Sequence, residues 1–350
     1  MKKNRLAALA AVVTTAALAL TGCVAGEGTS ASTPTASASK AATLGENGWS
    51  ATTLNIDFAT YNPLSLIVKQ EGYLESAFGT EVTVNWVKSA GSAAANAALL
   101  AGAIDVGSTA GSAALLARSN GSPIKTIDIY AQPDWAAIIV PKGSAITSVK
   151  DLAGKNVAAQ KGTDPYFFLL QALEKFKVPL SSVTIQNLPH ANGKAALENG
   201  SVDAWSGLDP LLTTSVLTAG SKNIYDNPSF NSYGFLNATE SFLQKSPDLA
   251  QAVVDAYEKA RAFAVKNPDE TANILAEAAG IDVSVARATL KRTDLTISPI
   301  PGAAQTKVLK VVGPIFVDSG DVPSQSLIDA ALKTLLEPKY AKAADPSAIK

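Results

Sequence analysis

The sequence predicts an α/β protein whose folded part has two units, each built on a β-sheet with helices. The chain has 350 residues, which is more than one ordinary core needs. Hydrophobic residues make up 47% and charged residues 17%, as is typical of a globular protein. From Thr53 onward, short apolar stretches alternate with helical patterns. That alternation indicates parallel sheets with helices on both faces.

The expected elements follow one another along the chain. Strands are expected at Thr53–Phe58, Glu81–Val87, Ile104–Gly107, Ile124–Tyr130, Ala136–Val140, Asn156–Ala159, Val183–Leu188, Val202–Trp205 and Tyr233–Asn237. Helices are expected at Leu64–Glu71, Ala93–Ala101, Ser112–Ser119, Ser148–Leu152, Tyr166–Phe176 and Gly193–Asn199, and from Asp209-Pro210. A helical C-terminal part is expected at Pro247–Lys266, Asp269–Ala279, Ser284–Leu290, Gln305–Asp318 and Ser324–Leu336.

Local signals set the ends of these helices. Gly102 and Gly200 each follow a helical pattern directly, as is common at helix C-termini. Pro165 suits the first turn of its helix, with Thr163 or Asp164 as the capping residue. The order of cap and proline therefore predicts where that helix begins.

The N-terminus is predicted to be a signal peptide over residues 1–22, followed by a tether. Its positive start consists of Lys2, Lys3 and Arg5. The apolar stretch Leu6–Leu20 is shorter than the roughly 20 residues that a transmembrane helix needs. It ends in Leu20-Thr21-Gly22-Cys23, which resembles the lipobox of bacterial lipoproteins and predicts a lipid on Cys23. Residues 23–50 are rich in Ser, Thr, Ala and Gly and are expected to form a flexible linker.

Charge and residue usage exclude several classes of function. Without residues 1–22 the chain has 26 basic and 30 acidic residues, and the dispersed basic residues do not favour nucleic-acid binding. The single cysteine, Cys23, excludes an internal disulfide and a zinc site of several cysteines. His190 is the only histidine, so a catalytic triad would have to use it. We expect no catalytic residue, no metal and no cofactor.

Six segments resemble the periplasmic solute-binding proteins of the sulfonate, taurine and nitrate type, most closely the aliphatic sulfonate group. They are Leu99–Gly107, Ile138–Ser144, Val149–Lys155, Lys161–Thr163, Gly200–Trp205 and Asp209-Pro210. No single segment is specific, but their order and spacing extend the resemblance over residues 53–340.

The resemblance implies a two-lobed periplasmic-binding-protein fold (type II) with the ligand between the lobes. Two crossover strands would lie near Ala136–Pro141 and Tyr233–Ala238. Lobe one would comprise residues 53–138 and 239–345, and lobe two residues 139–238. A monomer of this kind would work at the outer face of the bacterial cytoplasmic membrane. It would deliver its ligand to an ABC permease with its ATPase.

Two hydroxyl-rich segments at strand ends are expected to form an anion site, because N–H groups at helix N-termini hold anions without a cationic side chain. These segments are Ser108–Ser112 and Gln160–Asp164, each followed by a predicted helix. Gly111 and Gly162 would let an oxyanion approach the backbone. The arginines after the leader are all expected on helices away from these segments: Arg118, Arg261, Arg287 and Arg292.

Family position extends this site to both lobes. The expected ligand-binding residues are Tyr61, Asn62, Ser108, Thr109, Gly111, Ser112, Gln132, Trp135, Gly162, Thr163, Asp164, Trp205 and Asp209. Tyrosine and tryptophan would flank a short alkyl or aryl chain. The second tryptophan that the family often carries before Asp-Pro is missing from Trp205-Ser206-Gly207-Leu208, which opens space there. Asp164 and Asp209 are expected to cap their own helices.

The expected ligand is a small anion like an aliphatic sulfonate. An inward-pointing Asp134, Asp164 or Asp209 would favour a taurine-like zwitterion over nitrate. Taurine, nitrate and a pyrimidine or thiamine precursor stay open, and so does a sensor lipoprotein. Enzymes that share this fold need clusters of histidine and cysteine or a cysteine nucleophile, so a binding protein is favoured. His190 is interpreted as a surface or ligand-lining residue.

Overall fold

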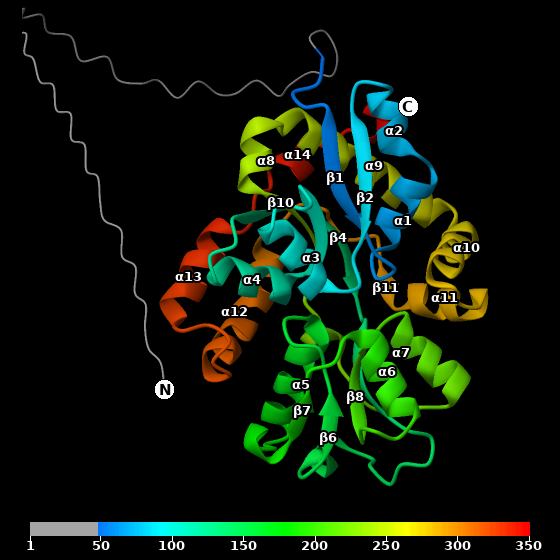
Figure 1. Ribbon diagram of the computed structural model, residues 1–350, viewed down its shortest axis with the longest axis vertical. Helices are drawn as coiled ribbons and strands as arrows, with labels where there is room; N and C mark the ends of the chain where they lie inside the picture. The colour runs from blue at the N-terminus through cyan, green and yellow to red at the C-terminus, as the bar shows by residue number, and fades with distance from the viewer. Residues whose placement is uncertain (1–47) are drawn as a thin grey trace, which may run out of the picture. The chain divides into compact units, whose positions relative to one another are not determined.

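The computed structural model describes residues 48–350 (Figure 1). The expected signal peptide, the lipid-bearing Cys23 and most of the expected linker lie outside the described residues. Within residues 48–350, no helix combines the length and the apolar character that crossing a bilayer requires.

The described part contains two sheets and helices throughout. The strands are β1 (Thr53–Phe58), β2 (Thr83–Lys88), β3 (Val106–Ala110), β4 (Ile124–Pro133), β5 (Ala136–Val140), β6 (Asn156–Ala158), β7 (Thr184–Gln186), β8 (Ala204–Leu208), β9 (Lys222–Asp226), β10 (Gly234–Thr239) and β11 (Thr293–Asp294). The α-helices are α1 (Pro63–Gln70), α2 (Tyr73–Phe78), α3 (Ser92–Leu100), α4 (Gly111–Ser119), α5 (Asp164–Lys175), α6 (His190–Glu198), α7 (Leu211–Thr214), α8 (Glu240–Lys245), α9 (Pro247–Lys266), α10 (Pro268–Ala279), α11 (Val283–Lys291), α12 (Ala303–Asp318), α13 (Gln325–Thr334) and α14 (Lys339–Lys342). Short 3₁₀ turns lie at Val149–Leu152, Leu180–Ser182, Pro228–Phe230 and Pro346–Ala348, and a π-helical turn at Ser215–Ala219.

The first sheet has six strands in the order β11-β4-β10-β3-β1-β2. β1 pairs in parallel with β2 and β3, whereas β10 is antiparallel to both β3 and β4. The helices α4 and α9 contact this sheet. We call the sheet with α1–α4 and α8–α14 the six-stranded region, which fills the upper part of Figure 1.

The second sheet has five strands in the order β7-β6-β8-β5-β9. β6 is parallel to β7 and β8, and β5 is antiparallel to β8 and β9. This sheet with α5–α7 is the five-stranded region, drawn in green in the lower part of Figure 1. The chain enters the region through Asp134 and Trp135 and leaves it between Phe230 and Gly234. The architecture is the two-sheet α/β arrangement expected from the sequence.

Parallel sheets were expected from the alternation of elements, whereas both sheets are mixed. β5 and β10 follow the two passages between the sheets, so each runs against its neighbours. Pairing with β10 also extends β3 to Ala110, beyond the predicted end at Gly107. The small and hydroxyl residues after Gly107 indicate a loop, but their backbone hydrogen bonds with β10 keep them in the strand.

The long helix α9 confirms its prediction over Pro247–Lys266. Proline stands at its first turn, where no intrahelical N–H bond is lost. Its buried positions include Leu249, Val253, Tyr257 and Ala264, spaced by about one or two turns. Amphipathic spacing of this kind fixes both the length of the helix and the face that it buries.

Gly234, the first residue of β10, packs directly against the ring of Tyr130 on the neighbouring strand β4. A methyl group on Gly234 would overlap the ring of Tyr130, which is fully buried. We expect Gly234→Ala to lower the free energy of unfolding by about 1–3 kcal/mol through overpacking. Thermal or urea unfolding measures this change. Gly143→Ala is the control, because no atom lies within 4 Å of its added methyl; equal losses in both variants would contradict the packing account.

Candidate functional site

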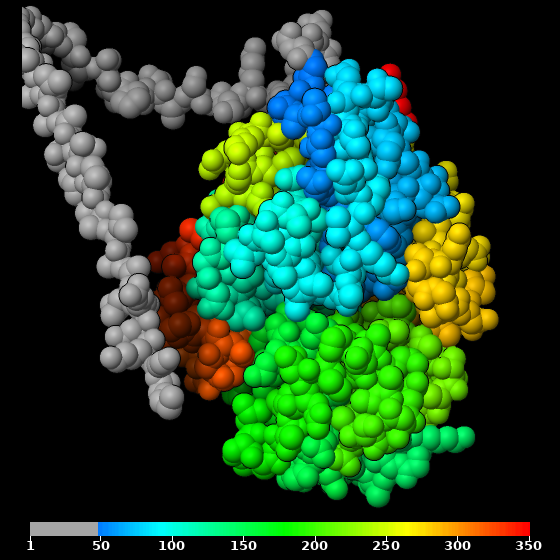
Figure 2. Space-filling view, viewed as in Figure 1, coloured from blue at the N-terminus to red at the C-terminus, as the bar shows by residue number. Residues whose placement is uncertain are grey.

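The two regions meet along a seam, which has α3 and α4 on one side and α5 and α6 on the other. Figure 2 shows the cyan residues of the six-stranded region resting directly on the green five-stranded region. α5 contacts both α4 and α12, and the rings of Phe167 and Phe316 are 4.3 Å apart. α7 contacts α11 farther along. The carboxyl ends of the parallel strands point toward this seam, where ligands of open α/β sheets bind.

Asp164, the first residue of α5, is the central polar contact of the seam. Its Oδ1 accepts hydrogen bonds from Ser112 Oγ (2.5 Å) and Ser232 Oγ (2.6 Å). Its Oδ2 accepts from Ser232 N and Trp135 Nε1, both at 2.8 Å. Burial raises the pKa of this carboxyl, and the four donors oppose that shift. Asp164 was expected to cap its own helix. Thr163, the other cap that the sequence allowed, is the N-cap, and the Asp164 carboxylate joins α4 to the segments between the sheets.

The segment Ser108–Ser112 is not the loop that the sequence predicted. Ser108 and Thr109 lie inside β3 and are fully buried. Ser108 Oγ donates to Asp57 Oδ1 (2.8 Å), and Thr109 Oγ1 accepts from Asn237 Nδ2 (2.7 Å). These hydroxyls, expected to bind an anion, are therefore paired within the chain.

The N-terminus of α4 is covered by the chain itself. Gly111 N donates to the carbonyl oxygens of Ser232 (2.9 Å) and Tyr233 (3.0 Å), and Ser112 N donates to Ser232 Oγ (2.7 Å). A Cβ on Gly111 would lie 2.8 Å from the ring of Phe235, so glycine is needed here for packing. The backbone of Gly111, which a ligand was expected to approach closely, is thus contacted by Ser232, Tyr233 and Phe235.

On the opposite side of the seam, residues 160–164 form the turn before α5. Thr163 Oγ1 donates to Gln160 O (2.6 Å), which fixes the turn. Gly162 has φ +75°, a left-handed conformation that favours glycine. A Cβ there would lie 3.8 Å from Ala93 of α3, so this turn faces the six-stranded region.

The predicted residues Tyr61, Asn62 and Trp135 form one buried group behind the seam. Tyr61 Oη donates to Ser108 O (2.9 Å), and its ring meets Trp135 edge-on at 6.1 Å. Asn62 caps α1 and donates to Ser108 Oγ (2.8 Å). Asp57 lies below them, and burial raises its pKa to about 6 despite the bonds from Ser108.

Gln132 and Trp205 lie apart from that group. Gln132 is exposed on β4, opposite Asp294 of β11. Trp205 is fully buried in an apolar cluster with Ala137 and Leu197, and its ring packs on Gly193 of α6. Both remain predictions as ligand-binding residues.

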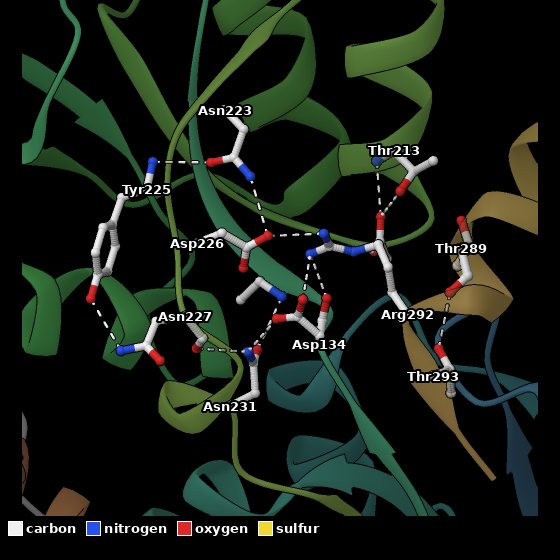
Figure 3. A network of polar contacts seen from close by, with 12 residues as sticks. Asp134, Thr213, Asn223, Tyr225, Asp226, Asn227, Asn231, Thr289, Arg292 and Thr293 are labelled. Atoms are coloured by element: carbon white, nitrogen blue, oxygen red, sulfur yellow. Dashed lines mark hydrogen bonds and ion pairs between the residues drawn. The ribbon is translucent and has the colours of Figure 1, made fainter.

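Arg292, at the end of α11, holds a second set of contacts between the regions (Figure 3). Its guanidinium group pairs with Asp209 (3.1 Å), Asp226 (2.9 Å) and Asp134 (3.5 Å). It also donates to the carbonyl oxygen of Asp134 at 2.5 Å. Arg292 was expected on a helix away from the two hydroxyl-rich segments; it ends α11 and contacts Asp134 and Asp209, two other residues considered for the site. The turn after α11 carries it back to the passage between the sheets, which local sequence patterns do not reveal.

The acidic partners of Arg292 have distinct environments. Asp209 was expected to cap its helix, but Pro210 is the N-cap of α7. Asp209 Oδ1 accepts from Thr213 N and Oγ1 within that helix, and its Oδ2 accepts from Arg292 Nε. Burial raises the pKa of Asp134 to about 6, although Arg292 opposes the shift. The three carboxylates predicted near the site, at positions 134, 164 and 209, all accept bonds from protein groups.

His190 was interpreted from the sequence as a surface or ligand-lining residue. It begins α6 rather than lying in a surface loop, and only 2% of it is exposed. Burial lowers its pKa to about 4, so the ring is neutral at pH 7. Neither ring nitrogen has a hydrogen-bond partner among residues 48–350.

Comparison with known proteins identifies the family of this chain. The family described as "NMT1/THI5 like" matches residues 65–271. The chain belongs to the NMT1/THI5-like family. A Bacillus subtilis (strain 168) relative is 30% identical over 233 residues, 65% of this chain and 70% of the relative. An Escherichia coli (strain K12) relative is 27% identical over 263 residues, 74% and 82% of the two chains. Both are named "Putative aliphatic sulfonates-binding protein".

Solved structures share the fold of this NMT1/THI5-like chain. The alkanesulfonate-binding protein SsuA from Xanthomonas axonopodis pv. citri, bound to MOPS, superposes with a TM-score of 0.72 at 24% identity, covering 80% of this chain and 98% of that one. The periplasmic nitrate-binding protein NrtA from Synechocystis PCC 6803 gives 0.70 at 13% identity, covering 87% and 92%. The two-sheet architecture is therefore the periplasmic-binding-protein fold.

The Arg292 contacts predict a measurable contribution to stability. Arg292→Lys removes the planar group that reaches Asp209, Asp226 and Asp134 together. We expect the free energy of unfolding to fall by about 1–3 kcal/mol in chemical denaturation. Arg287→Lys is the matched control, because the Arg287–Asp269 pair is exposed and its loss should stay within about 0.5 kcal/mol. Similar losses in both variants would disprove a special role for Arg292.

Asp57 predicts a pH dependence of stability. Its pKa is about 6 in the folded protein and near 3.8 when unfolded, so the folded state holds this proton more tightly. As pH rises from about 4 to about 6, this residue should lower the free energy of unfolding by up to ~3 kcal/mol. The free energy of unfolding of the wild type, minus that of Asp57→Asn, should therefore fall by up to that amount as the pH rises over this range. His190 and Asp134 titrate in both proteins and cancel in the difference. A constant difference would refute the assignment.

Proposed function

We propose that this protein is the extracytoplasmic solute-binding component of an ABC importer, and that it captures a small aliphatic sulfonate. The observation that carries the proposal is the seam, where helix N-termini of two sheet regions face each other. Such termini hold anions through N–H groups and the helix dipole. The relatives named for aliphatic sulfonates support the choice of ligand.

In this proposal the two regions are lobes that close on the ligand. Lobe one would comprise residues 53–138 and 239–345, and lobe two residues 139–238. Asp164 and Arg292 supply polar contacts between them, so they would stabilise the closed arrangement. A ligand that touches both regions shifts the population toward that arrangement. Tyr61, Asn62 and Trp135 would support the wall behind the ligand.

Export and anchoring complete the proposal. Residues 1–22 would direct export, and a diacylglyceryl group on Cys23 would hold the protein at the outer face of the membrane. The linker of residues 23–50 would leave the body free to dock on its permease at a raised local concentration. We expect no catalysis, since the described residues include one histidine, no cysteine and no cluster of metal-ligating side chains.

A thermal unfolding series tests the ligand. The purified protein is heated with ethanesulfonate, hexanesulfonate, taurine, nitrate or a thiamine-precursor pyrimidine. A ligand that binds only the folded state, at 100 times its dissociation constant, stabilises by about 2.7 kcal/mol and raises the melting temperature. We expect this response for the alkanesulfonates. Hexanoate and hexanol serve as controls for the alkyl chain.

The series also separates the alternatives. A response to the pyrimidine alone would retain the importer and reject the sulfonate. A response to taurine without ethanesulfonate would point to a zwitterion and to an acidic contact at the seam. If the melting temperature does not change with any of these compounds, the proposed ligand class is wrong.

A further inference from the structure

The helix N-termini at the seam differ in whether their first-turn N–H groups already have hydrogen-bond acceptors within the chain. At α4, the N–H groups of Gly111 and Ser112 already have acceptors on Ser232 and Tyr233, which precede β10. α5 begins with Asp164, whose own negative charge lies at that terminus. Neither of these termini suits a second anion.

The N-termini of α3 and α6 are different. Neither helix has a side-chain cap, and neither has an acidic residue in its first turn. The first-turn N–H groups of Ser92 and Ala93 in α3, and of Ala191 and Asn192 in α6, have no acceptor among the described residues. Both helices are nine residues long, so each contributes a full dipole at its first turn.

These two termini touch each other through His190 and Gly91. Gly91 is the N-cap of α3, and a Cβ placed on it would lie 3.1 Å from Nε2 and 3.0 Å from Cδ2 of His190. The Nε2 edge of the imidazole therefore points at the start of α3. Any larger residue at position 91 would cover that edge of the ring.

The imidazole itself is unpartnered. A neutral ring carries one N–H donor and one acceptor. A buried histidine with a structural role forms a hydrogen bond with the protein through at least one of them. His190 is 2% exposed, and among the described residues no group bonds to either nitrogen. Its backbone N–H is bonded to Gln160 Oε1 (3.2 Å), so the ring is held in place while its polar atoms stay available.

We propose that the sulfonate head group binds between the N-termini of α3 and α6, with His190 Nε2–H donating to one of its oxygens. This inference rests on the proposed function and names its binding residues. Three sulfonate oxygens match donors from three directions: the first turn of α3, the first turn of α6 and the imidazole. The site lies beside the Asp164 contacts and does not require their donors.

His190 gives a direct measurement on the unmodified sequence, because the chain has a single histidine. The full chain labelled with ¹⁵N-histidine shows one imidazole. Saturation with ethanesulfonate should shift the Nε2 resonance of that ring to a hydrogen-bonded N–H. Sodium sulfate and ethanol at the same concentration are the controls. An unchanged imidazole at full saturation with ethanesulfonate overturns the proposal.

Substitutions test the same contact by calorimetry. His190→Ala should weaken ethanesulfonate binding about 10- to 100-fold, the usual effect of losing a hydrogen bond to a charged group. Truncating the buried ring also leaves a cavity, so the ligand-free melting temperature of each variant is measured to separate lost packing from lost binding. His190→Gln, which restores a donor, should recover part of the affinity. Gly91→Ala should also weaken binding. Gly121→Ala should not, because this glycine also has a positive φ (+91°, against +150° at Gly91) but open surroundings.

The outcomes separate this inference from the proposed function. If the wild type binds ethanesulfonate and both His190 variants bind equally well, the histidine site is wrong and the sulfonate importer stands. If the wild type binds no sulfonate, the proposed function fails and takes this inference with it. If His190→Ala loses affinity only together with a lower ligand-free melting temperature, while the ring of the wild type is unaffected by ligand, the histidine has a structural role.

Discussion

The arrangement of the two regions depends on one buried carboxylate. Asp164 accepts four hydrogen bonds, from α4, from the first passage between the sheets and from the second. A buried charge is tolerated only when it is well paired, so each of these segments must keep its position for the others to be stable. The contact therefore aligns α5 with α4.

The sequence predicts the architecture well where the residues of a helix or strand alone determine its type and its ends. The limits of α9 follow from its proline and its apolar spacing, and both sheets were expected from the alternation of elements. The prediction fails where a distant strand intervenes. β3 extends to Ala110 because β10, more than 120 residues later, supplies its ladder partners. Short-range patterns carry no information about such a partner, so the end of the strand was misplaced, whereas α4 begins within one residue of its prediction.

The site was predictable only in its general position. Strand ends and small residues near positions 110 and 162 indicated the seam, and the family resemblance supplied Tyr61, Asn62 and Trp135, which do lie together there. The direction of the Asp164 side chain and the return of Arg292 depend on tertiary contacts. His190 lacked a recognisable motif. What distinguishes it is the combination of burial, missing partners and the facing Gly91, and none of these is visible in the sequence.

The position of β10 in the middle of the six-stranded sheet has a consequence for the order of folding. That strand joins β3 to β4, yet it follows the entire five-stranded region in the chain. The five-stranded sheet uses only residues 136–226, so its contacts are comparatively local and it can form as soon as that stretch is available. The larger sheet must wait for residue 239 before β10 can join β3 to β4, whose edges stay unpaired in the meantime, and for residue 294 before its edge strand β11 can pair. A chain that emerges from its N-terminus thus completes its second sheet before its first.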